Sequence, residues 1–146
     1  MRLNPDNPRV HSSRQIRQIA CSIETFGFIV PVLVDAHGNV MAGHGRVLAA
    51  RLLGRTEVPI ISVDHLSEAQ TRAFMIADNK LTENSTWDDR LLGEQLKVLA
   101  QLELDFSLEV TGFEMGEIDL RIEGLAAPPE DAIPPMLCPS RGPASP

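Results

Sequence analysis

The chain has 146 residues, 43% of them hydrophobic, and this size suits one buried core with a helical extension. No apolar run reaches the ~20 residues that a membrane span requires, and the first residues lack the apolar stretch of a signal peptide. Two cysteines are too few for a disulfide scaffold, so we expect a soluble protein of the reducing cytoplasm. Cys21 falls in a helical pattern and is expected to be a small core residue.

The net charge of −7 is divided unevenly along the chain. Residues 1–60 hold seven arginines and four acidic residues, whereas residues 61–146 hold six basic and sixteen acidic residues. Arginine binds phosphate in bidentate fashion, so the N-terminal half can accept an anionic ligand. A compositional preference for arginine explains the same excess, and the sequence leaves both explanations open.

The N-terminal segment predicts an arm followed by an amphipathic helix. Residues 4–8 contain two prolines and therefore predict a turn or an extended arm. Either Ser12 or Ser13 can cap the helix that follows, and Gly27 ends it. The apolar stripe expected on this helix consists of Ile16, Ile19, Ile23 and Phe26.

A β-hairpin is expected next, because β-branched residues at 31–35 and 40–42 flank a Gly/Asn turn at 36–39. Residues 57–63 predict a third strand, and Pro59 is typical of an edge position in a sheet. These strands predict a small mixed sheet that helices cover on its apolar face.

Helices dominate the rest of the chain. A short helix is expected over residues 44–53, and Ser67 with Gln70 forms a capping box ahead of a helix of roughly four turns. Asp88 caps another predicted helix, and residues 115–122 predict a short last one.

The composition changes after Gly124, since seven of the eleven prolines lie beyond it. The expected fold class is α/β (α+β): a small mixed sheet with a β-hairpin, packed by helices and followed by a helical C-terminal half. We expect one domain over residues 1–124, with its sheet-containing part at about 7–65 and its helical part at about 66–124. Residues 125–146 are expected to form a disordered, proline-rich tail.

The first candidate site is the turn Gly43, His44, Gly45 and Arg46, where a predicted strand ends and a helix begins. The first N–H groups of a helix are unpaired and its N-terminus is positive, so an anion is favoured there. Arg46 adds a charge and, as an expected surface residue, should add little to stability. A plain tight turn with Arg46 in solvent is the alternative. His44 is then polar surface rather than a phosphate donor or a general acid.

The second candidate is Asp78 with Asn79, late on the long predicted helix. A carboxylate beside an amide oxygen suits Mg²⁺, which usually arrives with nucleotide phosphates. Adjacent helical residues point about 100° apart, so both reach one ion only near a frayed helix end. An exposed polar face is the alternative.

These features occur in the order found in a known family. Over residues 7–123 the chain resembles the N-terminal domain of the ParB partition proteins, within the ParB/sulfiredoxin superfamily. It is most similar to the variant that is fused upstream of DNA methyltransferases in phage and bacterial genomes. The segments that carry the resemblance are Asn7-Pro8-Arg9, Ile19–Ile23 with Phe26-Gly27, Pro31–Val34, Gly43–Arg46 with Ala49-Ala50, and Asp78-Asn79.

The resemblance implies a domain that binds CTP, or another nucleotide, with Mg²⁺, clamps on DNA and hydrolyses the nucleotide slowly. By position, Gly43 and Arg46 would hold phosphates, and Asp78 with Asn79 would meet the metal. The implied role is chromosome partition or DNA modification. The implied partners are DNA bound weakly, a DNA methyltransferase domain or protein, and a second copy in a homodimer, with no membrane.

The sequence also departs from the family. Gly45 replaces the first arginine of a double-arginine signature, and Thr82 stands where the partition proteins carry another arginine. No helix-turn-helix domain follows, and both ends look cut relative to the relatives. Anion binding at the turn Gly43–Arg46 is still expected despite these changes. A weak CTPase, a nuclease and an inert truncated fragment remain the alternatives to a nucleotide-binding module.

Overall fold

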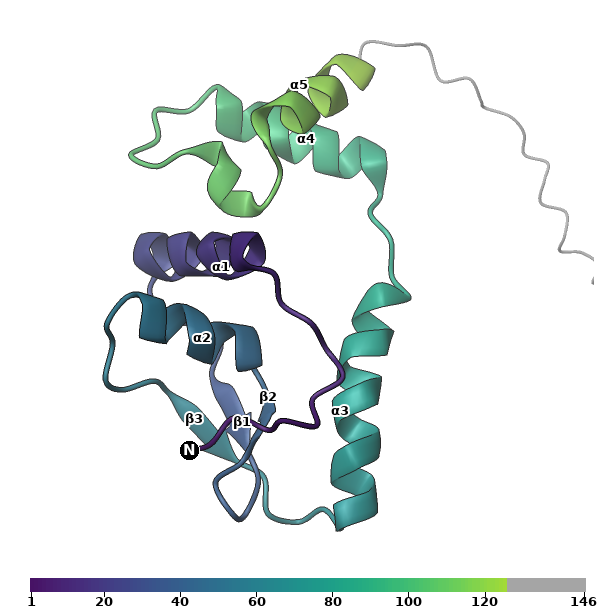
Figure 1. Cartoon of the computed structure of the whole chain (residues 1–146). Coiled ribbons are helices and arrows are strands. Elements are labelled where there is room, and N and C mark those ends of the chain that lie inside the picture. Colours follow the sequence, from purple (N-terminus) through teal and green to yellow (C-terminus); the bar gives the residue numbers. More distant parts are fainter. Residues whose placement is uncertain (126–146) are drawn as a thin grey trace, which may run out of the picture. The chain divides into compact units, whose positions relative to one another are not determined.

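The computed structural model describes residues 1–125, which fall into two compact units (Figure 1). The first unit consists of residues 1–86 with 109–112, and the second consists of 87–108 with the described residues from 113 onward. The expected α+β class is confirmed, because the first unit holds a small sheet packed by helices.

The unit boundary differs from the division that the sequence suggested. The helix α3 (Glu68–Glu83) belongs to the unit that contains the sheet, whereas the sequence placed it in the helical part. Of the tail predicted for residues 125–146, only Leu125 lies within the described residues.

The sheet contains β1 (Val32–Val34), β2 (Val40–Ala42) and β3 (Ile60–Ser62) in the order β2-β1-β3. β1 runs antiparallel to β2 and parallel to β3. The predicted hairpin and mixed sheet are therefore confirmed, and the strand after Pro59 lies at an edge as expected.

Local capping explains where two helices of this unit begin. α1 (Ser13–Phe26) starts at Ser12, whose side chain accepts the N–H of Gln15, and it ends at Gly27 with a φ of 87°. α3 starts with the predicted capping box, in which Ser67 and Gln70 bond each other's backbone N–H.

The core of the first unit lies on two sides of α2 (His44–Leu52), which runs beside α1 in Figure 1. Branched and small apolar residues fill it, because α2 packs against β1 on one side and against α1 on the other. The buried residues are Val32, Val34, Val40 and Val47 in one cluster, and Ala20, Ile23 and Ala49 in the other.

Two expectations for α1 are wrong. Cys21 is exposed rather than part of the core, because a helix turns about 100° per residue and places it far from the buried Ala20. Phe26 is 48% exposed, since it lies at the margin of the stripe in the last helical turn.

The second unit contains α4 (Asp89–Ala100) and α5 (Met115–Gly124). The 3₁₀ turn η1 (Leu108–Thr111) begins at the last residue before the chain returns to the first unit, so only Leu108 of this turn belongs to the second unit. Asp88 caps α4 as predicted, and α5 extends two residues beyond the expected end. Its core consists of Leu96, Leu108 and Ile118. None of the helices within residues 1–125 has the length and apolar character of a membrane span.

Candidate anion-binding site

The turn between β2 and α2 leaves three backbone donors without helical partners. Gly43 is the N-cap of α2, and no side chain caps the helix there. The first helical bond runs from the N–H of Val47 to the carbonyl of Gly43 (3.0 Å), so the N–H groups of residues 44–46 precede the helical ladder. These donors and the helix dipole favour an anion at this end of α2.

Gly43 itself is required by the backbone and by space. Its φ is 101°, in the left-handed region that residues with a side chain rarely adopt. A Cβ atom at this position would lie 3.0 Å from Nη2 of Arg46 and 3.3 Å from Cα of Val32. The turn can therefore pass close to both the arginine and the strand only with glycine here.

Arg46 is half-buried, so the expectation of a solvated surface arginine is wrong. Its side chain folds back toward the start of the helix, as helical side chains do, and its Nη2 donates to the carbonyl of Pro31 (3.0 Å). Its Nε is buried and has no hydrogen-bond partner among residues 1–125. A buried N–H without a partner costs about 1–3 kcal/mol, and a ligand oxygen would remove that cost.

The charge of Arg46 persists despite its burial. Burial lowers the pKa of Arg46, whereas the nearby carboxylate of Asp78 raises it. Arginine stays protonated in proteins, so the pocket keeps a fixed positive charge.

His44 is 7% exposed, so the alternative of a polar surface residue is wrong for it as well. Its Nε2 accepts the backbone N–H of Asn4 (3.4 Å), which places the ring proton on Nδ1. Burial, and next the charge of His11, lower the pKa of His44. The ring is therefore neutral at pH 7 and connects α2 to the N-terminal arm.

These groups surround a cavity of about 190 Å³. It is smaller than the roughly 300–1,000 Å³ of pockets that hold whole small-molecule ligands, so it suits a phosphate group of a larger ligand. All four residues of the turn contribute to its lining, together with Asn7, His11, Gln15, Ile19 and Asn79 among others.

The structure separates the two residues of the predicted metal pair. Asn79 lines the cavity, and its Nδ2 donates to the carbonyl of Met75 (2.8 Å), which leaves the amide oxygen as the coordinating group. Asp78 is exposed and does not line the cavity. Both residues lie inside regular helix, so the frayed end that would aim them at one ion is absent within α3.

Sequence reasoning did not single out His11 and Gln15 as site residues. Nδ1 of His11 and Oε1 of Gln15 lie 2.8 Å apart, and both side chains line the cavity. His11 directly precedes the N-cap Ser12, and Gln15 is the third residue of α1, so their closeness in sequence across the start of the helix was the available signal.

Residues 1–80 match the ParB N-terminal domain family. The chain belongs to this family. The ParB-like nuclease domain-containing protein YnaK of Escherichia coli K12 is 45% identical over 64 residues, which are 44% of this chain and 74% of YnaK. A probable plasmid-partitioning protein ParB of Deinococcus radiodurans is 33% identical over 93 residues, which are 62% of this chain but only 32% of that protein.

A solved structure shares the fold of this ParB-like domain. It is the C-terminally truncated chromosome-partitioning protein ParB of Caulobacter crescentus, complexed with CTP-γ-S. The TM-score is 0.73 over 88% of this chain and 76% of that one, at 23% sequence identity.

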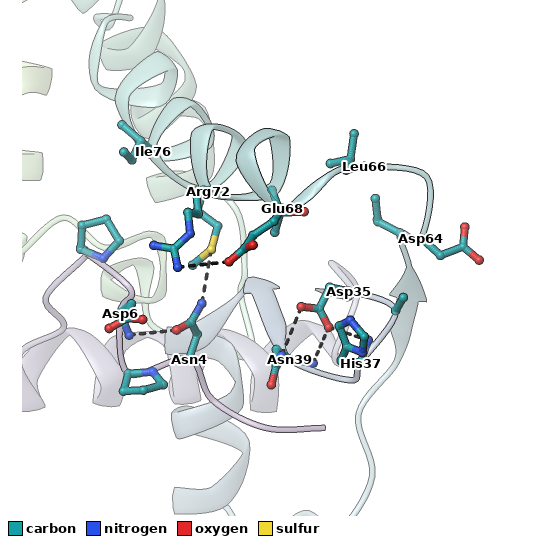
Figure 2. A pocket seen from close by; sticks show the side chains of 16 residues that line it. Asn4, Asp6, Asp35, His37, Asn39, Asp64, Leu66, Glu68, Arg72 and Ile76 are labelled. Atoms are coloured by element: carbon teal, nitrogen blue, oxygen red, sulfur yellow. Dashed lines mark hydrogen bonds and ion pairs between the residues drawn. The ribbon is translucent and has the colours of Figure 1, made fainter.

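The ParB-like domain also has a larger cavity, of about 700 Å³, bordered by the N-terminal arm, the hairpin turn and α3 (Figure 2). Its charge is wrong for phosphate. Its one arginine, Arg72, contacts Glu68 at 3.4 Å, and the other charged residues of the lining are acidic: Asp6, Asp35 and Asp64. Size alone would favour this cavity for a ligand, but the charge suited to a phosphate, that of Arg46, lies in the lining of the smaller one.

The Asp35 carboxylate of the larger cavity already has a structural role. Burial by itself would raise its pKa, but hydrogen bonds from Asn39 and His37 outweigh burial, and the pKa of Asp35 is lowered. Asp35 therefore closes the hairpin turn by accepting the N–H groups of His37 (2.9 Å) and Asn39 (2.8 Å).

Proposed function

We propose that this ParB-like domain binds a nucleotide, CTP in the first instance, through phosphates held at Gly43–Arg46. The observation that carries the proposal is the buried Nε of Arg46, which has no partner among residues 1–125 and belongs to a side chain that lines the cavity. The N–H groups that begin α2 supply further donors to the same space. The nucleotide acts as the regulatory ligand of a DNA partition or DNA modification system.

The identity of the ligand is supported by the comparisons. The Caulobacter crescentus ParB of the same fold was solved with CTP-γ-S, and a relative from Deinococcus radiodurans is named for plasmid partitioning. In the proposed system the partners are DNA, a DNA methyltransferase domain or protein, and a second copy of the chain.

Mg²⁺ would enter this site with the phosphates rather than as a resident ion. Among residues 1–125 no three His, Cys, Asp or Glu side chains are grouped to hold a metal. The donors present do suit Mg²⁺ that is bound mainly by phosphate oxygens, since such ions need only one or two protein ligands. Asn79 would supply an amide oxygen from the cavity wall, and Asp78 would supply negative charge beside it.

Substitution of Arg46 tests the proposal. Charge-assisted hydrogen bonds contribute roughly 1.5–3 kcal/mol each, so Arg46→Ala should weaken CTP binding about ten- to a hundredfold. Arg51→Ala is the matched control, because it removes an exposed arginine from the far end of the same helix. Calorimetric titration with CTP and Mg²⁺ measures the affinity of each variant.

Melting curves separate binding from folding, because Arg46 is half-buried and bonds Pro31. Arg46→Lys keeps the positive charge without the Nε–H donor, and we expect it to fold and still bind more weakly than the wild type. Equal affinity for Arg46→Ala and the wild type, or an equal loss in Arg51→Ala, would show that the turn does not hold the phosphates. Release of inorganic phosphate in the same samples distinguishes a binding module from a CTPase.

A further inference from the structure

The ring of His11 lies directly against Gly45, the second residue of α2. A Cβ atom at position 45 would be 3.1 Å from both Cε1 and Nδ1 of His11, and 2.9 Å from Cδ1 of Ile19. Gly45 is helical and is absent from the glycines with positive φ, so its backbone does not require glycine. The His11 ring and the Ile19 side chain together fill the space that a side chain at this position would need.

Glycine at position 45 has a cost in helix stability. Glycine within a helix is destabilising by roughly 0.5–1 kcal/mol relative to alanine. The chain accepts it at Gly45, where it brings the imidazole of His11 against the start of α2 and into the lining of the 190 Å³ cavity.

Gln15 holds the ring in this position. Its Oε1 lies 2.8 Å from Nδ1 of His11. An amide group can turn over and offer its N–H instead of its oxygen, so the pair stays bonded whichever ring nitrogen carries the proton. Nε2 of His11 can therefore donate a hydrogen bond while Nδ1 remains anchored to α1.

We propose that His11 is a phosphate-contacting residue of this pocket, held by Gln15 and given its place by the missing side chain at Gly45. The inference rests on the proposed nucleotide binding and adds a residue to it. The imidazole then supplements the N–H groups at the start of α2 and the guanidinium of Arg46, so three kinds of donor converge on one phosphate.

A double-mutant cycle on the full chain tests this pairing, with CTP and Mg²⁺ as the titrant. His11→Ala should weaken binding on the order of tenfold, because it removes one hydrogen bond to a charged ligand. Gly45→Ala should weaken it by a similar factor, since the added methyl group displaces the ring. The double variant should bind no more weakly than His11→Ala, because both changes act on the same ring.

Two further variants keep the result interpretable. Gln15→Leu keeps the His11 ring but removes the hydrogen bond that holds it, so we expect a smaller loss of affinity than in His11→Ala. His65→Ala removes an exposed histidine that does not line the cavity, and its affinity should equal that of the wild type. Melting curves for every variant identify a loss of affinity that is only a loss of folded protein.

The outcomes separate this inference from the proposed function. If the wild type binds CTP and His11→Ala binds equally well, or if the losses in His11→Ala and Gly45→Ala multiply in the double variant, the role of His11 is refuted. Nucleotide binding at Arg46 is then unaffected. If the wild type binds no nucleotide, both proposals fail together.

Discussion

His44 shows how a single polar side chain can be buried when it has a defined partner. Its ring accepts the N–H of Asn4, and this contact fastens the N-terminal arm to the start of α2. Burial, and next the charge of His11, lower the pKa of His44, so the folded protein holds the ring neutral. Protonation would break the contact with Asn4 and place a charge in a buried position.

The lowered pKa of His44 makes the stability of the first unit depend on pH. The unfolded chain protonates this histidine near its ordinary pKa of about 6.5, whereas the folded chain does so only at lower pH. The stability that the neutral ring of His44 contributes to the first unit is therefore complete above about pH 6.5, and it is lost as the pH falls through the lowered pKa.

We expect His44→Asn to reduce the fall in melting temperature between pH 7.5 and pH 5. His65→Asn removes an exposed histidine, so its melting temperature should depend on pH as that of the wild type does. Melting curves at several pH values measure both slopes. Identical slopes in His44→Asn and the wild type would mean that burial of this ring is not linked to protonation.

At the scale of elements, the pair α4 and α5 in the second unit depends on a close approach at Gly93. This glycine is buried, and a Cβ atom on it would lie 3.0 Å from the backbone carbonyl of Arg121 and 3.2 Å from Cδ2 of Leu125. The two helices are also connected by the ion pair of Arg121 with Asp89 (2.8 Å). The small residue on α4 therefore sets how closely α5 packs.

Gly93→Ala should destabilise the second unit. Overpacking costs roughly 1–3 kcal/mol, which exceeds the roughly 0.5–1 kcal/mol that alanine gains over glycine in a helix. Gly116→Ala is the control, because no atom lies within 4 Å of a Cβ at that position of α5, and this variant should be slightly stabilised. Chemical denaturation followed by fluorescence of Trp87 reports on this unit. A Gly93→Ala protein as stable as the wild type would show that the helices can separate without cost.

At the scale of the whole molecule, the two units differ in charge. The first unit holds nine basic and nine acidic residues, whereas the described part of the second holds three basic and nine acidic residues. Eight of the basic residues in the first unit are arginines. The second unit therefore repels a polyanion such as DNA, whereas the charges of the first unit balance and give no net repulsion.

We expect the isolated chain to bind duplex DNA weakly and without sequence preference. Its binding should fall steeply between about 50 and 200 mM salt, because contacts to phosphates release counterions. Fluorescence anisotropy with two unrelated duplexes measures both properties. Tight binding to one duplex at physiological salt would require a recognition surface that this charge distribution does not provide.

The sequence by itself determined the elements whose signals are local. Ser12, Ser67 and Asp88 cap their helices as predicted, because each bonds an N–H three residues away, independently of the rest of the fold. The hairpin followed from its turn residues for the same reason. The position of Gly43–Arg46 at a helix start was also predictable, since a strand, two glycines and a helical pattern follow one another directly.

Only the tertiary structure decided which side chains of these elements meet. Arg46 was expected at the surface, and a surface position was one alternative for His44. Arg46 is half-buried and His44 is buried, because Pro31 and Asn4, distant in sequence, approach the start of α2. The same long-range packing places His11 of the arm against Gly45 and brings Asn79, but not Asp78, into the cavity. Such contacts depend on how α1, α3 and the sheet pack together, and no pattern within a few residues of sequence contains that information.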